Sequence, residues 1–124
     1  MQKSAPHPHP KITILQKRAD FLRAARGFGQ GAGGMKVQAH PREDGSDDIR
    51  VGFTCTKKLG NAVARNRAKR RLRAIARDIL PRKGNAGWDY VLIGRPDVTI
   101  ARDFADLQQD FEFALRKLHQ KAAP

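Results

Sequence analysis

The chain has 124 residues, of which 25 are Lys or Arg and 12 are Asp or Glu, giving a formal net charge of +13 at pH 7. This length fits one domain with one core, and the charge points first to a nucleic-acid partner and second to an anionic membrane surface. No apolar run approaches the ~20 residues that span a bilayer, which argues against a transmembrane protein. The single cysteine, Cys55, excludes an intramolecular disulfide and suits a reducing compartment, so we expect a cytoplasmic location.

Residues 1–12 are expected to form a disordered tail ahead of a single domain at 13–120, with 121–124 as a second short tail. Prolines recur within the first ten residues and disfavour regular structure there. The two histidines of this segment, His7 and His9, are weak candidates for a metal site. A disordered tail is the favoured interpretation of the segment.

Residues 15–26 predict a short amphipathic helix, because apolar side chains recur there at helical spacing. The stripe consists of Leu15, Ala19, Leu22 and Ala25 or Arg26. Phe21 lies beside the stripe, and the pattern alone leaves open whether it packs in the core or faces a ligand. The next segment, 27–34, contains five glycines, with no strand before it and no Gly-Lys-Ser/Thr after it. We therefore interpret it as a flexible connection and not as a phosphate-binding loop.

Two strands are expected next, at 35–40 and 49–56, separated by an acidic turn at 41–48. The second strand alternates regularly and places four apolar side chains on its core face: Ile49, Val51, Phe53 and Cys55. In that setting Cys55 is interpreted as a small core residue and not as a nucleophile. The acidic residues of the turn match no calcium-loop spacing, so a polar hairpin loop is favoured over a metal cluster. These residues are Glu43, Asp44, Asp47 and Asp48.

The rest of the chain predicts a helix at 61–80, a short buried strand at 90–93 and a last helix at 101–120. Pro81 is expected to end the first of these helices. The last helix has apolar side chains along one side: Phe104, Leu107, Phe111, Leu115 and Leu118. The element order α-β-β-α-β-α, with room for an extra edge strand in 27–40, predicts an α+β fold in which helices pack on a small sheet.

The helix at 61–80 belongs to the most basic stretch of the chain, since residues 57–77 carry nine Lys or Arg and no acidic residue. Its apolar stripe consists of Ala64, Ala68, Leu72, Ile75 and Ile79. Opposite the stripe we place Lys69, Arg70, Arg73 and Arg77, with Asn66 among them, and Arg65, Arg67 and Arg71 at its borders. A solvated surface helix normally mixes acidic with basic residues at i,i+4 spacing, so this pattern favours a phosphate-binding face.

The predicted elements bring together no paired carboxylates, no Ser/His/Asp set and no Cys/His cluster. No catalytic residue is therefore expected, and a self-sufficient nuclease is disfavoured. A ribosomal or ribosome-assembly protein is a second alternative, because it would share the charge and the small α+β fold. The membrane surface is disfavoured in turn, since the basic helix carries none of the Trp or Phe that interfacial helices use.

The run RVGFTCTKKLGNAVARNRAKRRLR at 50–73 closely resembles the signature of the bacterial ribonuclease P protein subunit, with Arg65-Asn66-Arg67 as its Arg-Asn-Arg motif. The Asp20-Phe21 pair, Gly27 and the Gly94-Arg95-Pro96 run extend the resemblance over about residues 15–118. It implies a small α+β fold with a left-handed βαβ crossover, an exception to the usual hand. It also implies an accessory subunit of an endoribonuclease. This subunit binds the catalytic RNA and the 5′ leader of precursor tRNA, and assists Mg²⁺-dependent removal of the leader.

The resemblance also implies a role for individual residues. Those expected to face the catalytic RNA are Lys57, Arg65, Asn66, Arg67, Lys69, Arg70 and Arg73. Those expected at the leader are Phe21, Thr54, Thr56 and Lys58. The RNA would carry out the hydrolysis and bind most of the Mg²⁺, so no metal site on the protein is expected. Neither a DNA partner nor a membrane partner is expected. Ala25 stands where the family often has a second aromatic residue, so base stacking is expected to be thinner here.

Overall fold

The structure, a computed structural model, describes residues 10–123. Residues 1–9, which include His7 and His9, lie outside that range, and with them most of the tail predicted at 1–12. The elements in chain order are β1 (Ile12–Ile14), α1 (Arg18–Ala25), β2 (Phe28–Gly31), β3 (Met35–Pro41), β4 (Ile49–Thr54), the 3-10 turn η1 (Lys57–Leu59), α2 (Ala62–Lys83), β5 (Trp88–Gly94), α3 (Val98–Ala101) and α4 (Phe104–Ala122). Among the described residues, no helix combines the length and apolar character needed to cross a membrane.

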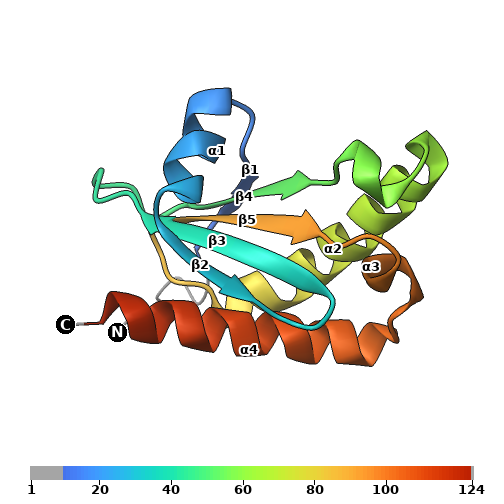
Figure 1. Ribbon diagram of the computed structural model, residues 1–124. Coiled ribbons are helices and arrows are strands. Elements are labelled where there is room, and N and C mark those ends of the chain that lie inside the picture. The colour runs from blue at the N-terminus through green and yellow to red at the C-terminus, as the bar shows by residue number, and fades with distance from the viewer. Residues whose placement is uncertain (1–9, 124) are drawn as a thin grey trace.

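The five strands form one mixed sheet in the order β1-β4-β5-β3-β2 (Figure 1). β4 is parallel to β1 and to β5, whereas β3 is antiparallel to β5 and to β2. The segment β4-α2-β5 is therefore a parallel βαβ unit. The predicted α+β class is confirmed, and the hand of the crossover stays a prediction.

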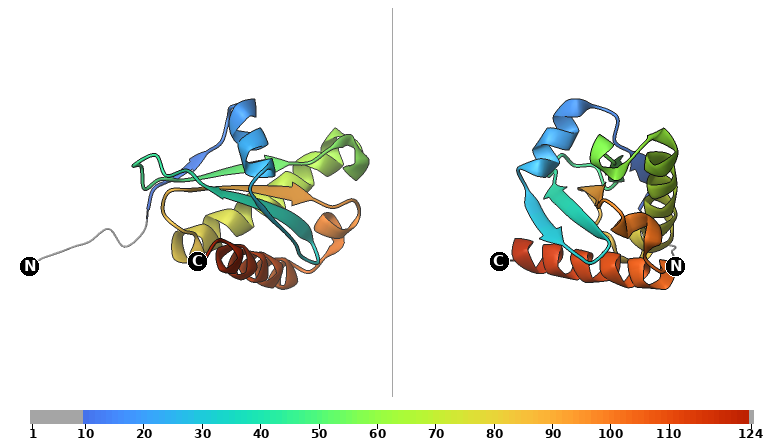
Figure 2. Two further views of the ribbon diagram at one scale, coloured as in Figure 1. Left: turned by 60° about the vertical axis from the view of Figure 1, so that its left-hand side comes forward. Right: turned by 45° about the vertical axis from the view of Figure 1, so that its right-hand side comes forward.

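Helices cover both faces of the sheet, with α2 and α4 on one face and α1 on the other (Figure 2). The alternation in β5 shows this division, because Tyr90 and Leu92 belong to the main core under α2 and α4, whereas Val91 packs with Ala24 of α1. In β4 the predicted alternation is confirmed. Ile49 and Val51 are buried in the main core, and Phe53 and Cys55 pack against it.

The helix α2 begins where predicted but extends one turn further. The Oδ1 atom of Asn61 accepts a hydrogen bond from the backbone N–H of Ala64 at 2.9 Å, so Asn61 caps the helix. The prediction that α2 ends at Leu80 is wrong, because Pro81 lies in its last turn, where it removes only one N–H from the ladder. The following N–H of Gly84 still bonds to the carbonyl of Leu80 at 2.9 Å.

The apolar stripe predicted for the first helix is wrong. In α1 the buried residues are Asp20 and Ala24, whereas Leu22 is exposed. The carboxylate of Asp20 accepts a hydrogen bond from Arg50 of β4, which turns this side of α1 toward the sheet. A partly buried ion pair thus accompanies this rotation of α1, and apolar spacing alone could not indicate it.

The glycine-rich segment at 27–34 is ordered into the edge strand β2, so its interpretation as a flexible connection is wrong. Its last glycine, Gly34, donates its N–H to Asp110 Oδ2 at 2.8 Å and accepts from the hydroxyl of Thr99 at 2.7 Å. A Cβ atom at Gly34 would overlap the side chain of Leu107 on α4. Glycine is needed here for the close approach of the backbone to α4.

The acidic loop at 41–48 is not a hairpin, contrary to the prediction, because β5 lies between β3 and β4 and pairs with both. The guanidinium of Arg42 holds the loop. It donates to Asp44 at 2.9 Å, to the buried Asp89 of β5 at 2.9 Å and to the carbonyl of Asp48 at 2.7 Å. The loop therefore crosses the end of β5 and is fixed to it by charge-assisted hydrogen bonds.

The last helix, predicted at 101–120, is confirmed as α4, and the short helix α3 that precedes it was not predicted. Four residues of the predicted apolar side are buried as expected: Leu107, Phe111, Leu115 and Leu118. The fifth, Phe104, is 38% exposed, and the guanidinium of Arg71 lies 5.7 Å from its ring centroid. Phe104 is therefore a surface aromatic residue that contacts α2 through a cation.

His119 of α4 is expected to make stability depend on pH. The Tyr90 hydroxyl accepts from the backbone N–H of Asn85 at 2.9 Å and shares a second hydrogen bond with Nε2 of His119 at 2.8 Å. Burial lowers the pKa of His119 below its ordinary value. The neutral ring contributes stability above about pH 6.5, and this contribution is lost as the pH falls. Urea unfolding between pH 8 and pH 5 should show a steeper loss in the native chain than in His119→Gln. Equal slopes would contradict this prediction.

Candidate nucleic-acid interface

The most basic surface of the protein is the outer side of α2. Between Asn66 and Arg77, its exposed polar side chains are Asn66, Arg67, Arg70, Arg73 and Arg77. They extend over about 16 Å of helix at 1.5 Å per residue. The opposite side of α2 is buried in the main core. The sequence therefore produces a helix with one apolar side and one cationic side, as predicted.

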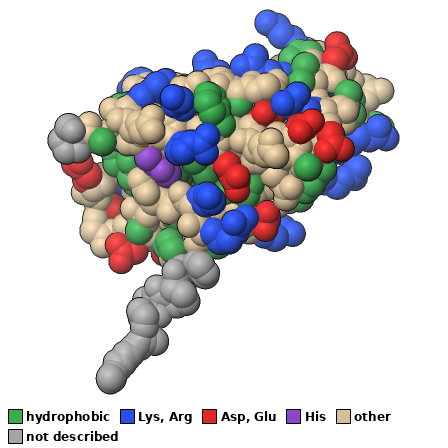
Figure 3. Space-filling model, turned by 90° about the horizontal axis from the view of Figure 1, so that it is seen from below, with side chains coloured by type: hydrophobic (Ala, Val, Ile, Leu, Met, Phe, Trp, Pro, Cys, Tyr) green, Lys and Arg blue, Asp and Glu red, His purple; other side chains and the backbone are tan. Residues whose placement is uncertain are grey.

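Most of the exposed cations on α2 are free to bind an anion. Within residues 10–123, the arginines of α2 that donate hydrogen bonds are Arg65, Arg71 and Arg82. The other four guanidinium groups have no ion-pair partner in that range. By contrast, acidic and basic side chains are intermixed on the face of the molecule seen from below (Figure 3). Unpaired arginines at close spacing favour a phosphate backbone as the ligand.

Two residues of the predicted RNA-facing set are half-buried, which for Arg65 agrees with its predicted place at the border of the apolar stripe. Arg65 is half-buried, and its Nη1 atom donates to the carbonyl of Gly60 at 2.9 Å. Lys69 is also half-buried, which corrects its predicted place opposite the core. Arg71 is turned inward as well and donates to the carbonyl of Arg102. The open part of the set consists of Lys57, Asn66, Arg67, Arg70 and Arg73.

A second candidate surface lies on the face of the sheet that carries α1. The Phe21 ring covers Gly52 of β4 so closely that a Cβ atom there would lie 2.5 Å from two ring carbons. Thr54 is two residues further along β4, and its side chain is on the same face. Beyond the end of β4, Thr56 and Lys58 are exposed in and beside η1. The four predicted leader residues thus lie on α1, on β4 and in or beside η1.

Two polar residues on this second surface were missed by the sequence analysis. Lys36 and Gln38 of β3 lie directly opposite Ile93 and Val91 of β5 in the antiparallel register. Directly opposite residues project from the same face, and Val91 packs with α1. Lys36 is exposed and adds a cation to this face. The period-two alternation of 35–41 was the signal that could have identified both residues.

The side chains of the two surfaces suit the binding of a ligand. Among residues 10–123, no three His, Cys, Asp or Glu side chains lie close enough together to hold a metal ion. Burial raises the pKa of the Cys55 thiol, so the group stays protonated near neutral pH. This supports the interpretation of Cys55 as a core residue. Arginines can grip phosphates, and the half-buried Phe21 ring can accept a stacked base.

Comparison with known proteins shows similarity over nearly the whole described range. A family model described as Ribonuclease P matches residues 10–119. The "Ribonuclease P protein component" of Ruegeria pomeroyi is 63% identical over 109 residues, which is 87% of each chain. The protein of the same description from Caulobacter vibrioides is 46% identical over 114 residues, covering 92% of this chain and 75% of the relative.

Solved structures give the same result for the fold. The Staphylococcus aureus RNase P protein superposes with a TM-score of 0.69 at 26% identity, over 84% of this chain and 93% of that one. The RNase P protein from Thermotoga maritima superposes with a TM-score of 0.67 at 28% identity, over 86% of this chain and 96% of that one. The compared folds therefore share the sheet and the helices on which both candidate surfaces lie.

Proposed function

The chain belongs to the ribonuclease P protein family, the protein components of a tRNA-processing endoribonuclease, and on this premise we propose that it binds the catalytic RNA and the 5′ leader of precursor tRNA. The observation that carries the proposal is the set of unpaired arginines on the outer side of α2. Such a row of fixed charges costs stability through self-repulsion unless a polyanion neutralises it. RNA is the polyanion that the family membership implies.

The outer side of α2 is the proposed contact with the catalytic RNA. Arg67, Arg70 and Arg73 bind phosphates, since a guanidinium can donate two parallel hydrogen bonds to one phosphate group. Asn66 adds an amide that can both donate and accept. Arg65 acts beside them, and its bond to Gly60 also fixes the turn that leads into α2. Lys57 and Lys69 extend the positive surface on either side.

The face of the sheet beside α1 is the proposed contact with the leader. Phe21 stacks on a base, which is a contact that tolerates any sequence. The hydroxyl groups of Thr54 and Thr56 bond to the sugar-phosphate backbone, and Lys58 neutralises a phosphate. Lys36, on β3, contacts the same single-stranded leader. A single-stranded leader suits this face, because only unpaired bases expose their flat surfaces for stacking.

In this proposal the protein acts by electrostatics and positioning. It reduces the repulsion between two polyanions and holds the precursor in place, while the RNA carries out the phosphodiester hydrolysis. Both surfaces present cationic or neutral side chains, a donor set that suits phosphates and not Mg²⁺, which prefers carboxylate and phosphate oxygens. We therefore assign the Mg²⁺ ions mainly to the RNA. We also propose that the assembled enzyme is cytoplasmic.

Replacing Arg67 and Arg70 together with glutamine is expected to weaken binding to the catalytic RNA and to lower the log–log salt slope by about one to two units. Both side chains are exposed, so the melting temperature should stay within a few degrees of the native value. The matched control is Arg116→Gln with Lys117→Gln, which removes the same charge from the exposed surface of α4. Equal losses in the two double variants would mean that only net charge matters, and would refute a specific interface on α2.

A further inference from the structure

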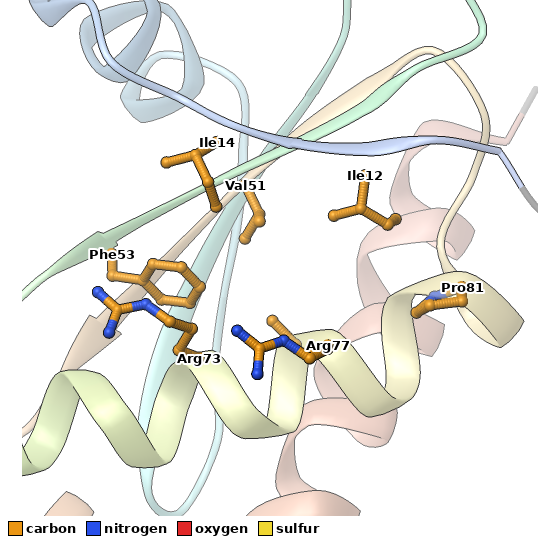
Figure 4. Close-up of a pocket in the computed structure, with 8 residues that line it drawn as sticks. Ile12, Ile14, Val51, Phe53, Arg73, Arg77 and Pro81 are labelled. Atoms are coloured by element: carbon orange, nitrogen blue, oxygen red, sulfur yellow. The ribbon is translucent and has the colours of Figure 1, made fainter.

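A groove opens between β1, β4 and α2, at the β1 edge of the sheet and on the same face as the main core (Figure 4). Its volume is about 420 Å³, within the range of small-molecule sites. Ile12 and Ile14 line it from β1, Val51 and Phe53 from β4, and Arg73 and Arg77 from α2. The groove therefore combines an apolar wall with two cations from the basic helix.

The two arginines differ in their contacts. The guanidinium of Arg73 lies 5.6 Å from the centroid of the Phe53 ring, in cation–π range. Arg77 is exposed and has no ion-pair partner among the described residues. The far wall contains Ile14, which is 53% exposed and so is accessible to a ligand in the groove. The preferred ligand should thus join a flat apolar part to an anion.

We propose that this groove binds one unpaired nucleotide of the RNA partner, a proposal that rests on the proposed function. The base lies against Phe53 and Ile14, and the phosphate group is bound by Arg77 with Arg73 beside it. A nucleotide meets both demands of the groove, because its base has two flat faces and its phosphate is a fixed anion.

The position of the groove along α2 supports this occupant. Arg67, Arg70, Arg73 and Arg77 follow one another along the helix over about 15 Å. A backbone that follows the first three residues therefore arrives at the groove without leaving the basic surface. An apolar peptide segment would leave the two guanidinium groups without partners, so it is the less favoured occupant.

The first test is a methyl NMR titration of the full chain with adenosine 5′-monophosphate, with inorganic phosphate and adenosine as separate probes. The expected result is saturable shifts of the Ile12, Ile14 and Val51 methyl signals, with binding at least about tenfold tighter than for phosphate or adenosine alone. Ile14→Glu adds a negative charge to the wall and should weaken this binding about tenfold. Gln109→Glu makes the same charge change on the exposed surface of α4 and should leave it unchanged.

The second test measures the affinity for the catalytic RNA. Ile14→Glu should lower it about tenfold, and Gln109→Glu by no more than about twofold. Arg77→Gln, which leaves the apolar wall intact, should act like Ile14→Glu if each variant keeps the native melting curve. The proposal is overturned if the groove methyl signals show no saturable shift. That absence of a shift is the result expected of a groove that binds an apolar peptide. It is also overturned if Ile14→Glu and Arg77→Gln bind the catalytic RNA like the native chain.

These outcomes are distinguishable from a failure of the proposed function. The titration with the mononucleotide involves no RNA partner, so it reports on the groove even if the chain does not bind the catalytic RNA. Conversely, the Arg67 and Arg70 double variant leaves the groove wall untouched. A native RNA affinity in that variant, together with a loss in Ile14→Glu, would remove Arg67 and Arg70 from the interface and keep the groove.

Discussion

Replacing Asp89 with alanine is expected to lower the free energy of unfolding by about 3–5 kcal/mol, because it removes the fully buried carboxylate that two guanidinium groups share. The carboxylate of Asp89 is fully buried. It accepts hydrogen bonds from Arg42 at 2.9 Å and from two nitrogens of Arg50 at 2.7 and 2.6 Å. The Arg42 side chain is only 5% exposed, so water cannot replace the lost partner. Urea unfolding at neutral pH measures the effect.

The matched control is Asp44→Ala, which removes the other carboxylate that pairs with Arg42. Asp44 lies in the exposed loop, so this change should cost far less stability than Asp89→Ala. A loss below about 1 kcal/mol for Asp89→Ala, with the native fold retained, would show that the buried pairs contribute little net stability. A large loss would identify Asp89 as the residue that holds the acidic loop, β4 and β5 together.

The same ion network connects stability to the leader surface. Arg50 bonds to Asp89 and also lies 3.4 Å from the carboxylate of Asp20 on α1. Asp20 directly precedes Phe21, so this pair fixes the rotation of α1 and the position of the Phe21 ring above the sheet. The bond to Asp89 raises the pKa of the Arg50 guanidinium further, and the group stays charged at any working pH.

The sequence predicted those elements whose apolar pattern is long or regular. The alternation from Ile49 to Cys55 and the apolar side of the last helix indicated the correct faces, because burial of one face enforces the periodicity. The α2 helix was predicted to within a turn for the same reason. Its basic outer side could be predicted from the sequence alone. The cations of 57–77 that belong to the helix lie outside its apolar stripe, so they project from its other sides.

Elements that depend on distant partners were missed or misjudged. β1 has only three residues, and its state is set by parallel pairing with β4, where Ile12 lies opposite Ile49. The glycines of 27–34 favoured a flexible connection, whereas Gly34 is held by contacts with α4. The acidic composition of 41–48 predicts a hairpin loop between β3 and β4. This prediction is wrong because a later strand, β5, lies between them, which the local sequence cannot show.

The candidate site was predicted in composition and less well in geometry. Helical spacing placed Lys69 opposite the core, but in the structure it is half-buried at the side of α2. Arg65 faces the turn before the helix, since its first turn projects beyond the main core. The groove beside β1 could not be predicted, because it is formed by a strand that the sequence analysis did not identify.

Phe21→Ala is expected to reduce both stability and leader binding, because the ring has two contacts. Phe21 packs against the second cluster of Leu15, Ala24 and Val91 and covers Gly52, but it is only half-buried. The loss in unfolding free energy should therefore be about 2 kcal/mol, below the ~3–5 kcal/mol of a fully buried phenylalanine. Loss of a stacked base should cost a further ~1–3 kcal/mol in binding precursor tRNA to the reconstituted enzyme. Mature tRNA, which has no leader, should bind almost as before.

Phe21→Leu separates the two contacts. Leucine can still cover Gly52 and contact Leu15, so stability should return to within about 1.5 kcal/mol of the native value. It has no aromatic face, so the ratio of precursor to mature tRNA affinity should stay reduced by roughly tenfold, which corresponds to about 1.4 kcal/mol of stacking. Melting curves and the two affinities decide the matter. A native affinity ratio in Phe21→Leu would mean that the ring serves only to pack α1 on the sheet. The leader would then be held by the polar residues Thr54, Thr56 and Lys58 without base stacking at α1.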